Sequence, residues 1–201
     1  SLLIESTTFG EKSMRITTWN INSVRPRIGL ALKLLNQSRP DVLCLQETKC
    51  PDEQFPFEAF RDIGYKYIAV NGMKAYNGVA LISRVPFESE LALNWTERLD
   101  CRHISAIFPG DIEIHNFYVP AGGDEPDIEG NDKFAHKLDF INEMTDWFNS
   151  SRKKSDKLVL VGDLNIAPLE SDVWSHKQLI KVVSHTPIET LSLTRLQETL
   201  N

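Results

Sequence analysis

Hydrophobic and polar positions follow two different periods along the chain, which indicates strands interleaved with helices. Residues 15–20 alternate one by one, as a half-buried strand does, and residues 41–47 are read as a second strand. Between them, four apolar residues are spaced as on one face of a helix that begins near Pro26: Ile28, Ala31, Leu32 and Leu35. The first third of the chain therefore predicts a strand, a helix and a strand.

The middle of the chain adds strands and another helix. Residues 57–63 suggest a short helix that stops at Gly64. Further strands are predicted at residues 65–70, 78–83, 102–108 and 112–119, the last two forming a hairpin around a Pro-Gly-Asp turn. A long helix capped by Asn131 or Asp132 is predicted from the apolar stripe Phe134, Leu138, Ile141, Met144 and Phe148.

The segment around residue 160 is the clearest strand of the second half. Residues 158–161 are four consecutive branched aliphatics, which is typical of a strand buried on both faces. The run ends at Gly162 and is followed by Asp163 and Asn165. Residues 179–183 are ambiguous, and Leu193, Leu196 and Leu200 indicate a helix near the end. The whole pattern predicts a mixed α/β (α+β) sandwich.

Residues 1–13 show no clear period. They are interpreted as an N-terminal extension of low structural weight, which leaves residues 14–201 as one domain. No apolar run approaches membrane-spanning length, so no membrane partner is expected. Three cysteines, Cys44, Cys50 and Cys101, lack framework spacing and favour reduced thiols in a cytoplasmic protein.

The net charge of −6 argues mildly against a protein that coats nucleic acid by electrostatics alone. It does not exclude a nuclease, because a bound divalent cation and a local basic rim can offset the overall charge.

Polar side chains gather at the ends of the predicted strands. Glu47 suits a hard cation such as Mg²⁺, and Asp163 suits a general base that takes a proton from water. Asn20, Asn165 and the Tyr118 hydroxyl can donate hydrogen bonds to an anion without adding negative charge. Singly, each has an ordinary explanation as a turn or loop residue. Together they predict metal-assisted hydrolysis of a phosphodiester.

Five ordered motifs resemble those of the exonuclease III and apurinic/apyrimidinic endonuclease family, within the endonuclease/exonuclease/phosphatase superfamily. They are Thr18-Trp-Asn-Ile-Asn22, Leu45-Gln-Glu-Thr-Lys49, Asn77-Gly-Val-Ala-Leu-Ile82, Asn116-Phe-Tyr-Val-Pro120 and Gly162-Asp-Leu-Asn-Ile166. The resemblance runs from about Met14 through at least Pro168. It implies a four-layered αββα sandwich.

The resemblance also implies an activity and a site. The family comprises DNA-repair enzymes that remove nucleotides from 3′ ends of duplex DNA and cleave at abasic sites, with Mg²⁺ as cofactor and Mn²⁺ as a substitute. Carried over by position, Glu47 and Asn20 would lie at the metal, Asp163 would orient the attacking water, and Asn20, Tyr118 and Asn165 would contact the phosphate. Substrate would be bound by Asn22, Lys49, Asn77 and Arg102. A monomer acting on duplex DNA is expected.

The sequence departs from the family in one respect. Family members continue with a DNA-contacting segment, a further aspartate and a closing Ser-Asp-His motif, so C-terminal strands are expected to be missing and activity impaired. His185 lies in a superficially similar context but lacks the preceding aspartate. Two alternatives stay open: a phosphatase or phospholipid phosphodiesterase of the same superfamily, or an inactive truncated remnant with at most weak DNA binding.

Overall fold

The computed structural model describes residues 2–9 and 12–200, and the chain divides into two compact units. The first, which we call the sandwich unit, comprises the chain up to Asn94 together with Leu99–Tyr118 and Lys157–Asp163. The second, the helical unit, comprises Trp95–Arg98, Val119–Asp156 and the chain from Leu164 onward. Each unit is described by itself below.

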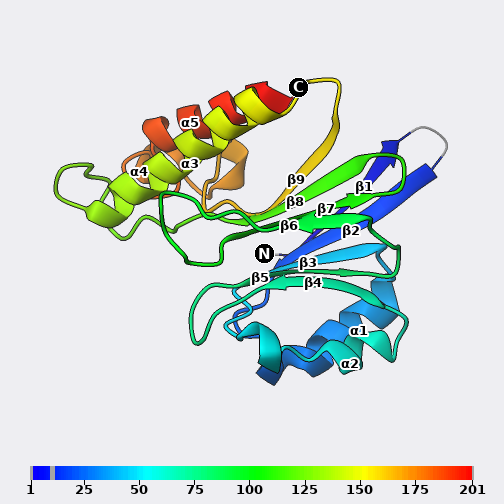
Figure 1. The fold of residues 1–201 in the computed structure, drawn as a ribbon. Helices are drawn as coiled ribbons and strands as arrows, with labels where there is room; N and C mark the ends of the chain where they lie inside the picture. Colours follow the sequence, from blue (N-terminus) through cyan, green and yellow to red (C-terminus); the bar gives the residue numbers. More distant parts are fainter. Residues whose placement is uncertain (1, 10–11, 201) are drawn as a thin grey trace. The chain divides into compact units, whose positions relative to one another are not determined.

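The sandwich unit contains a five-stranded sheet with the order β1-β2-β3-β5-β4 (Figure 1). Its strands are β1 (Leu2–Phe9), β2 (Lys12–Asn20), β3 (Val42–Gln46), β4 (Tyr67–Asn71) and β5 (Val79–Ser83). β2 and β3 run parallel, and the other neighbours are antiparallel. The parallel pair delivers the C-terminal ends of β2 and β3, and hence Asn20 and Glu47, to the same edge of the sheet.

A four-stranded sheet with the order β6-β7-β8-β9 completes the strands of this unit. They are β6 (Ser89–Leu91), β7 (His103–Phe108), β8 (Ile112–Tyr118) and β9 (Lys157–Asp163). β8 and β9 are parallel, with Tyr118 opposite Asp163 at their ends. The predicted hairpin of residues 102–119 is confirmed as the antiparallel pair β7–β8.

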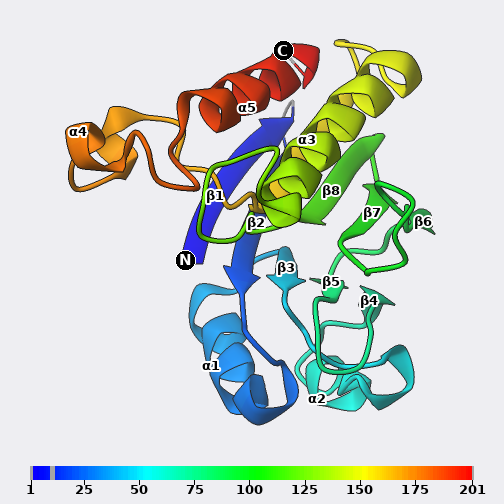
Figure 2. The ribbon, with the colours of Figure 1, turned by 90° about the vertical axis from the view of Figure 1, so that its left-hand side faces the viewer.

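The apolar faces of the two sheets pack on each other. One buried cluster joins Val42, Cys44 and Leu81 of the first sheet to Ile104 and Ile114 of the second. The opposite face of the first sheet is covered by helices (Figure 2). These are α1 (Ile28–Ser38) and α2 (Phe57–Arg61), with the 3₁₀ turns η1 (Arg25–Arg27) and η2 (Asp52–Gln54). β3 is buried along its whole length because both of its faces are covered.

A buried pair of amides links the two sheets. Gln46 Nε2 on β3 donates to Asn116 Oδ1 on β8 at 2.8 Å, and neither side chain is appreciably exposed. Asn116 Nδ2 donates in turn to the carbonyl oxygens of Leu45 and Ala80, at 2.9 and 3.0 Å. A side chain of one sheet thus satisfies backbone acceptors of the other, which fixes the alignment of the sheets one residue before Glu47 and two residues before Tyr118.

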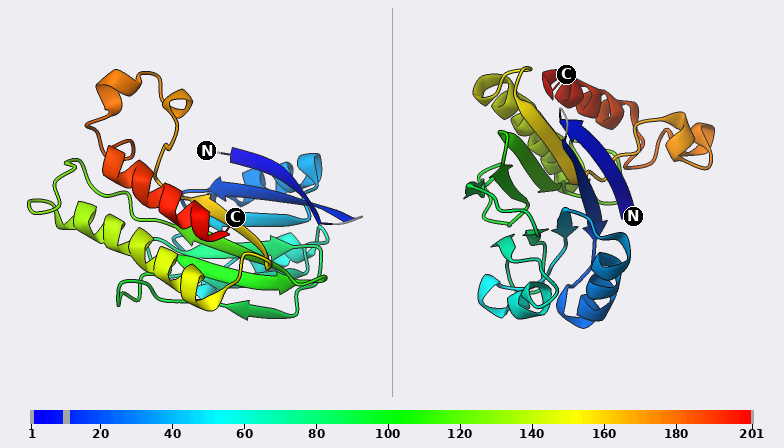
Figure 3. Two further views of the ribbon diagram at one scale, coloured as in Figure 1. Left: turned by 90° about the horizontal axis from the view of Figure 1, so that it is seen from above. Right: turned by 90° about the vertical axis from the view of Figure 1, so that its right-hand side faces the viewer.

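The helical unit is built on two long helices that lie side by side, α3 (Asp132–Ser151) and α5 (Pro187–Leu200) (Figure 3). Between them the chain forms the 3₁₀ turn η3 (Glu170–Asp172) and the short α4 (His176–Leu179). The predicted cap of α3 is confirmed, since the Asn131 side chain accepts a hydrogen bond from Lys133 N at 3.0 Å. In the described part of the chain, no helix combines the length and apolar character that a membrane span requires.

Two expectations are corrected. Residues 2–9 form β1 and pair with β2, so most of the proposed extension is structured, although the domain boundary at Met14 stays a prediction. The strand at residues 158–161 is only partly buried, because β9 lies at the end of its sheet. The three cysteines form no disulfide with one another, and burial raises the pKa of the Cys44 thiol.

Gly162 allows β9 to lie against β8 just before Asp163. Its φ is +143°, and a Cβ atom there would lie 1.9 Å from the carbonyl oxygen of Phe117. No side chain fits this approach, because the obstacle is backbone rather than a flexible side chain. The residue before the candidate base therefore has to be glycine.

We expect Gly162→Ala to lower the free energy of unfolding by at least about 2 kcal/mol, because it adds strain and a backbone clash. Urea unfolding followed by circular dichroism would measure the loss. Gly29→Ala is the matched control: Gly29 lies in α1, and a Cβ atom added there would meet nothing within 4 Å, so alanine should be neutral or stabilise by up to about 1 kcal/mol. Equal urea midpoints for the two variants would contradict this assignment.

Candidate active site

The strand-end residues predicted from the sequence converge around one carboxamide. Asn20 Nδ2 donates to Glu47 Oε1 and to Asp163 Oδ2, each at 2.8 Å. Tyr118 Oη donates to the same Glu47 oxygen, also at 2.8 Å. Four side chains from β2, the end of β3, β8 and β9 therefore form one hydrogen-bonded cluster within the sandwich unit.

The cluster stabilises the ionised form of Glu47. Partial burial acts to raise the pKa of Glu47, but hydrogen bonds from Asn20, Lys49 and Tyr118, with the Lys49 charge, outweigh it and lower the pKa. Glu47 Oε2 lies 2.9 Å from Lys49 Nζ. The carboxylate is thus charged at neutral pH and is held by donors on both of its oxygens.

Tyr118 remains a neutral hydrogen-bond donor. Its burial, and then its hydrogen bond to Glu47, raise the pKa of the phenol. Arg102 lies against the ring, with its guanidinium carbon 4.9 Å from the ring centroid, and Arg102 Nη1 donates to the Tyr118 carbonyl at 3.2 Å. Arg102 also donates to Asp100 Oδ2 at 2.6 Å. The structure therefore places Arg102 as a neighbour of Tyr118.

Asn22 and Lys49 form a second polar pair beside Glu47. Lys49 Nζ donates to Asn22 Oδ1 at 2.6 Å while it contacts Glu47. The backbone N–H of Asn22 donates to Asn20 Oδ1 at 3.2 Å, so the amide oxygen of Asn20 faces Asn22 rather than Glu47. Both predicted substrate-binding residues thus lie next to the cluster.

Asn77 has a supporting position under the Glu47 loop. Its Nδ2 donates to the Asp100 carbonyl at 2.9 Å, and its own carbonyl accepts from Lys49 N at 2.9 Å. The next residue, Gly78, has a φ of +91° and accepts from Thr48 N at 3.1 Å. Five predicted site residues have left-handed backbone conformations, as strained functional loops often do: Asn22, Glu47, Lys49, Asn77 and Asn165.

The donor set suits a hard divalent cation. Mg²⁺ binds through one or two carboxylates and keeps several waters, and Glu47 offers a charged carboxylate at the end of a strand. No group of three or more His, Cys, Asp or Glu side chains arranged to hold a metal occurs in the described residues. Glu47, with the Asn20 amide oxygen nearby, is the type of sparse oxygen donor set that a hard divalent cation accepts.

Asn165 lies in the helical unit, where a buried ion pair holds its loop. Its side chain donates to the Val119 carbonyl at 2.8 Å, and its carbonyl accepts from Lys137 Nζ at 2.7 Å. Lys137 and Glu189 are fully buried and lie 2.5 Å apart, Nζ to Oε1. The Glu189 carboxylate also accepts from Ser184 N and from Thr186 N and Oγ1. Local sequence pattern does not reveal this pair, because its two partners are far apart in the chain.

The histidines have local partners. His185 Nδ1 lies 2.7 Å from the Ala167 carbonyl, and its Nε2 lies 2.8 Å from His176 Nδ1. In the sandwich unit, His115 is buried on β8 between His103 and Glu113, at 2.9 Å from each. Burial, and then the neighbouring His115, lower the pKa of His103 well below its usual value. His115 is thus a buried strand histidine rather than part of the cluster around Glu47.

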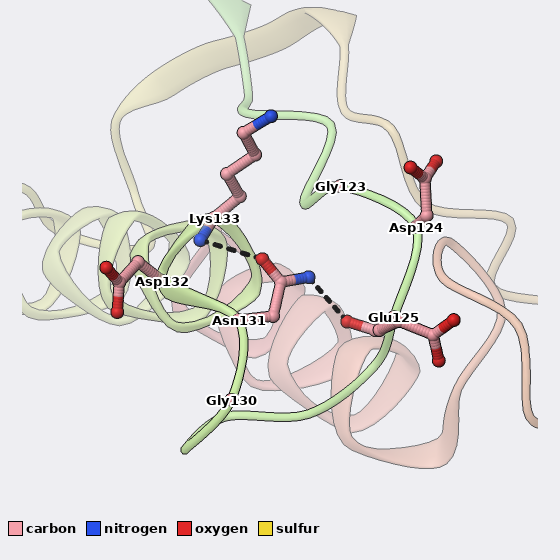
Figure 4. A pocket seen from close by; sticks show the side chains of 7 residues that line it. All are labelled: Gly123, Asp124, Glu125, Gly130, Asn131, Asp132 and Lys133. Atoms are coloured by element: carbon pink, nitrogen blue, oxygen red, sulfur yellow. Dashed lines mark hydrogen bonds between the residues drawn. The ribbon is translucent and has the colours of Figure 1, made fainter.

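A separate hollow lies at the N-terminal end of α3 (Figure 4). It is lined by Gly123, Asp124, Glu125, Gly130, Asn131, Asp132 and Lys133. The Asn131 side chain lines this hollow. Its Oδ1 accepts from Lys133 N at 3.0 Å, and its Nδ2 donates to the Glu125 carbonyl at 2.6 Å. These hydrogen bonds serve the cap of the helix and the preceding loop.

The fold is a mixed α/β fold with two packed sheets. Its candidate site is an acidic cluster at the ends of the strands. Residues 17–188 match the model of the endonuclease/exonuclease/phosphatase family. Because the match covers most of the chain, the protein belongs to this family.

Named relatives agree with this placement. Exodeoxyribonuclease III of Haemophilus influenzae is 28% identical over 169 residues, which cover 80% of this chain and 60% of the relative. An AP endonuclease from Archaeoglobus fulgidus superposes with a TM-score of 0.82 at 30% identity, covering 91% of this chain and 69% of that one. The 3′ phosphatase NExo from Neisseria, bound to a product DNA hairpin, superposes with a TM-score of 0.83 at 28% identity. The superposition covers 92% of this chain and 71% of that one. The likeness confirms the expected fold class, and the chain spans about three fifths of the curated relative.

We expect Lys137→Met to lower the free energy of unfolding by about 3–5 kcal/mol, because it leaves the Glu189 charge buried without its cation. Adding Glu189→Gln should recover part of this loss, since glutamine removes the charge and keeps an acceptor for Ser184 and Thr186. A double-mutant cycle measured by urea unfolding gives the coupling free energy.

The exposed pair Arg61–Glu58 provides the control cycle, through Arg61→Met and Glu58→Gln. Its coupling should be about 0–0.5 kcal/mol, as for other exposed helix pairs. A Lys137–Glu189 coupling no larger than this control would show that the buried pair does not hold the loop.

Proposed function

We propose that this chain contains the strand-end catalytic cluster of an exonuclease III-like, Mg²⁺-dependent hydrolase that cleaves phosphoester bonds in DNA. The observation that carries the proposal is the Asn20 amide, which binds Glu47 and Asp163 at the same time. It brings a charged carboxylate suited to a cation next to a carboxylate suited to a base.

Glu47 would hold the magnesium ion, with the Asn20 oxygen as the second candidate ligand. The ion, when bound, supplies positive charge that stabilises the negative charge developing on the phosphoryl oxygens. Tyr118 and Asn20 keep the Glu47 carboxylate ionised and oriented toward that role. Lys49 contacts Glu47 in this structure and would move toward a phosphate oxygen of the substrate.

Asp163 would act as the general base. A water oxygen attacks the phosphorus in line with the scissile bond, Asp163 takes the proton of that water, and the bond from phosphorus to the leaving oxygen breaks. Asn20 and Tyr118 donate to Glu47 and Asp163 in this structure, and they would have to exchange one of these hydrogen bonds to donate to a phosphoryl oxygen of the substrate. Asn165, two residues after Asp163, is proposed as a further donor on the basis of its motif.

DNA is the proposed substrate, with abasic sites and 3′ ends as the points of attack. The support is the likeness to exodeoxyribonuclease III and to an AP endonuclease, at 28% and 30% identity. Arg102 and Lys49, which flank the cluster, are suitable partners for backbone phosphates.

A phosphatase activity on DNA 3′ ends is the second candidate. Its specific support is the similarity to a 3′ phosphatase whose structure contains a product DNA hairpin. Both activities would use the same base and the same cation. They differ in the leaving group, so a single assay with two substrates separates them.

Single-turnover assays of this chain with Mg²⁺ test the proposal. One substrate is a duplex with a single abasic-site analogue, and the other a duplex with a 3′ phosphate. Asp163→Asn should lower the rate on either by at least about 10²-fold, because the proton acceptor is lost. Glu47→Gln should lower it similarly and raise the Mg²⁺ concentration that is needed.

Glu58→Gln, an exposed glutamate on α2, is the control and should leave the rate unchanged. Cleavage by Asp163→Asn at the rate of the parent chain would refute the role of Asp163. Salt-dependent DNA binding by the parent chain without cleavage of either substrate would instead support the inactive-remnant alternative.

A further inference from the structure

A second polar site lies in the sandwich unit, at the opposite ends of the strands that carry Asn20 and Glu47. A cavity of about 410 Å³ is lined by Ser13, Arg15, Arg39, Asp41 and Arg84. Arg15 lies near the start of β2, and Asp41 directly precedes β3. The five residues of β3 separate this cavity from the Glu47 loop by roughly 17 Å. The cavity is therefore distinct from the candidate active site.

Asp41 organises the cavity. Its Oδ1 accepts from Arg84 Nε at 3.0 Å and from Arg84 Nη2 at 2.7 Å, and its Oδ2 accepts from Arg15 N at 2.8 Å. The backbone of Asp41 is hydrogen-bonded as well: its N–H donates to the Arg15 carbonyl at 2.8 Å, and its carbonyl accepts from Arg84 N at 3.2 Å. The Asp41 carboxylate thereby orients Arg84, and among the described residues no hydrogen bond is found for Arg84 Nη1.

The charges in the cavity do not balance. Three arginines and one aspartate line the cavity, so the lining carries a net charge of two positive units. Such an excess is unfavourable by itself, because like charges repel, and it contrasts with the net charge of −6 of the whole chain. A ligand of charge −2 would neutralise it.

Arg39 adds an independent indication. It ends α1 in a left-handed conformation, with φ +45° and ψ +52°, and its N–H donates to the Leu35 carbonyl at 3.1 Å. Glycine is the usual residue at this position because a side chain there costs backbone strain. Among the described residues, no hydrogen bond is found for the Arg39 guanidinium, so no partner within the fold explains an arginine here.

We propose that Arg15, Arg39 and Arg84 form a binding site for a phosphate dianion, either inorganic phosphate or a terminal phosphate ester. The guanidinium fork matches pairs of phosphate oxygens. Arg39 would supply such a fork, and Arg84 would supply Nη1 beside its hydrogen bonds to Asp41. Arg15 donates from Nη1 to the Ser38 carbonyl at 2.7 Å and would supply its other guanidinium N–H groups. The charge of the lining matches a monoester or free phosphate, which carries about −2 at neutral pH, rather than a backbone diester, which carries −1.

Isothermal titration calorimetry of the chain with inorganic phosphate, in EDTA and at constant ionic strength, tests the site. The parent chain should bind with saturation. Arg39→Gly should weaken binding at least about tenfold, because one charge-assisted contact is lost, while its urea midpoint stays equal or rises as backbone strain is relieved. Arg61→Gln, which removes another exposed arginine, on α2 and outside the cavity, should bind as the parent does.

A short oligonucleotide with and without a 5′ phosphate distinguishes the two sources of the dianion. Tighter binding of the phosphorylated form, lost in Arg39→Gly, identifies a terminal ester as a ligand, and equal weak binding of both forms assigns the site to free phosphate. The proposal is overturned if the parent chain shows no saturable phosphate binding, or if Arg39→Gly and Arg61→Gln bind phosphate equally. Because no metal or turnover is involved, this outcome is independent of the proposed hydrolase activity.

Discussion

The candidate active site depends on one hydrogen-bond donor shared by two carboxylates. Glu47 and Asp163 come from different sheets, and without a donor between them their charges would favour separation. The Asn20 amide lies 2.8 Å from an oxygen of each, so it offsets part of that repulsion without adding a charge. A lysine at this place would form a strong ion pair with both and would compete with a divalent cation. A neutral amide leaves the cluster acidic.

This arrangement requires two sheets that do not slide on each other. The buried amides Gln46 and Asn116 supply that constraint at the right place, since Gln46 precedes Glu47 and Asn116 lies two residues before Tyr118. Apolar packing alone would tolerate small shifts, because it has no direction. The hydrogen bonds from Asn116 to the Leu45 and Ala80 carbonyls tolerate few such shifts. A shift would break them, and an unpaired buried amide is costly. The polar pair fixes the alignment that the apolar core stabilises.

The sequence was sufficient for the strand-end residues but not for the contacts that hold them. Period and motif order predicted β2, β3, β8 and β9, and they placed Asn20, Glu47, Tyr118 and Asp163 at strand ends, where the structure brings them together. The edge position of β9 and the strand at residues 2–9 depend on pairing between distant segments, which local pattern does not encode. The motif search found Asn116, but the same limit hid its role in linking the sheets, because its partners are 36 to 71 residues away in the chain.

The buried pair in the helical unit shows why stability alone does not explain these polar groups. An apolar pair at Lys137 and Glu189 would avoid the desolvation of two charges and could stabilise α3 against α5 equally well. It would not bind the Asn165 and Ala121 carbonyls, nor the amides of Ser184 and Thr186. The ion pair thus links the backbone of the loops at Ala121, Asn165 and Ser184. In the sandwich unit, buried polar groups fix the backbone next to Glu47 and Tyr118, and in the helical unit they fix the backbone next to Asn165.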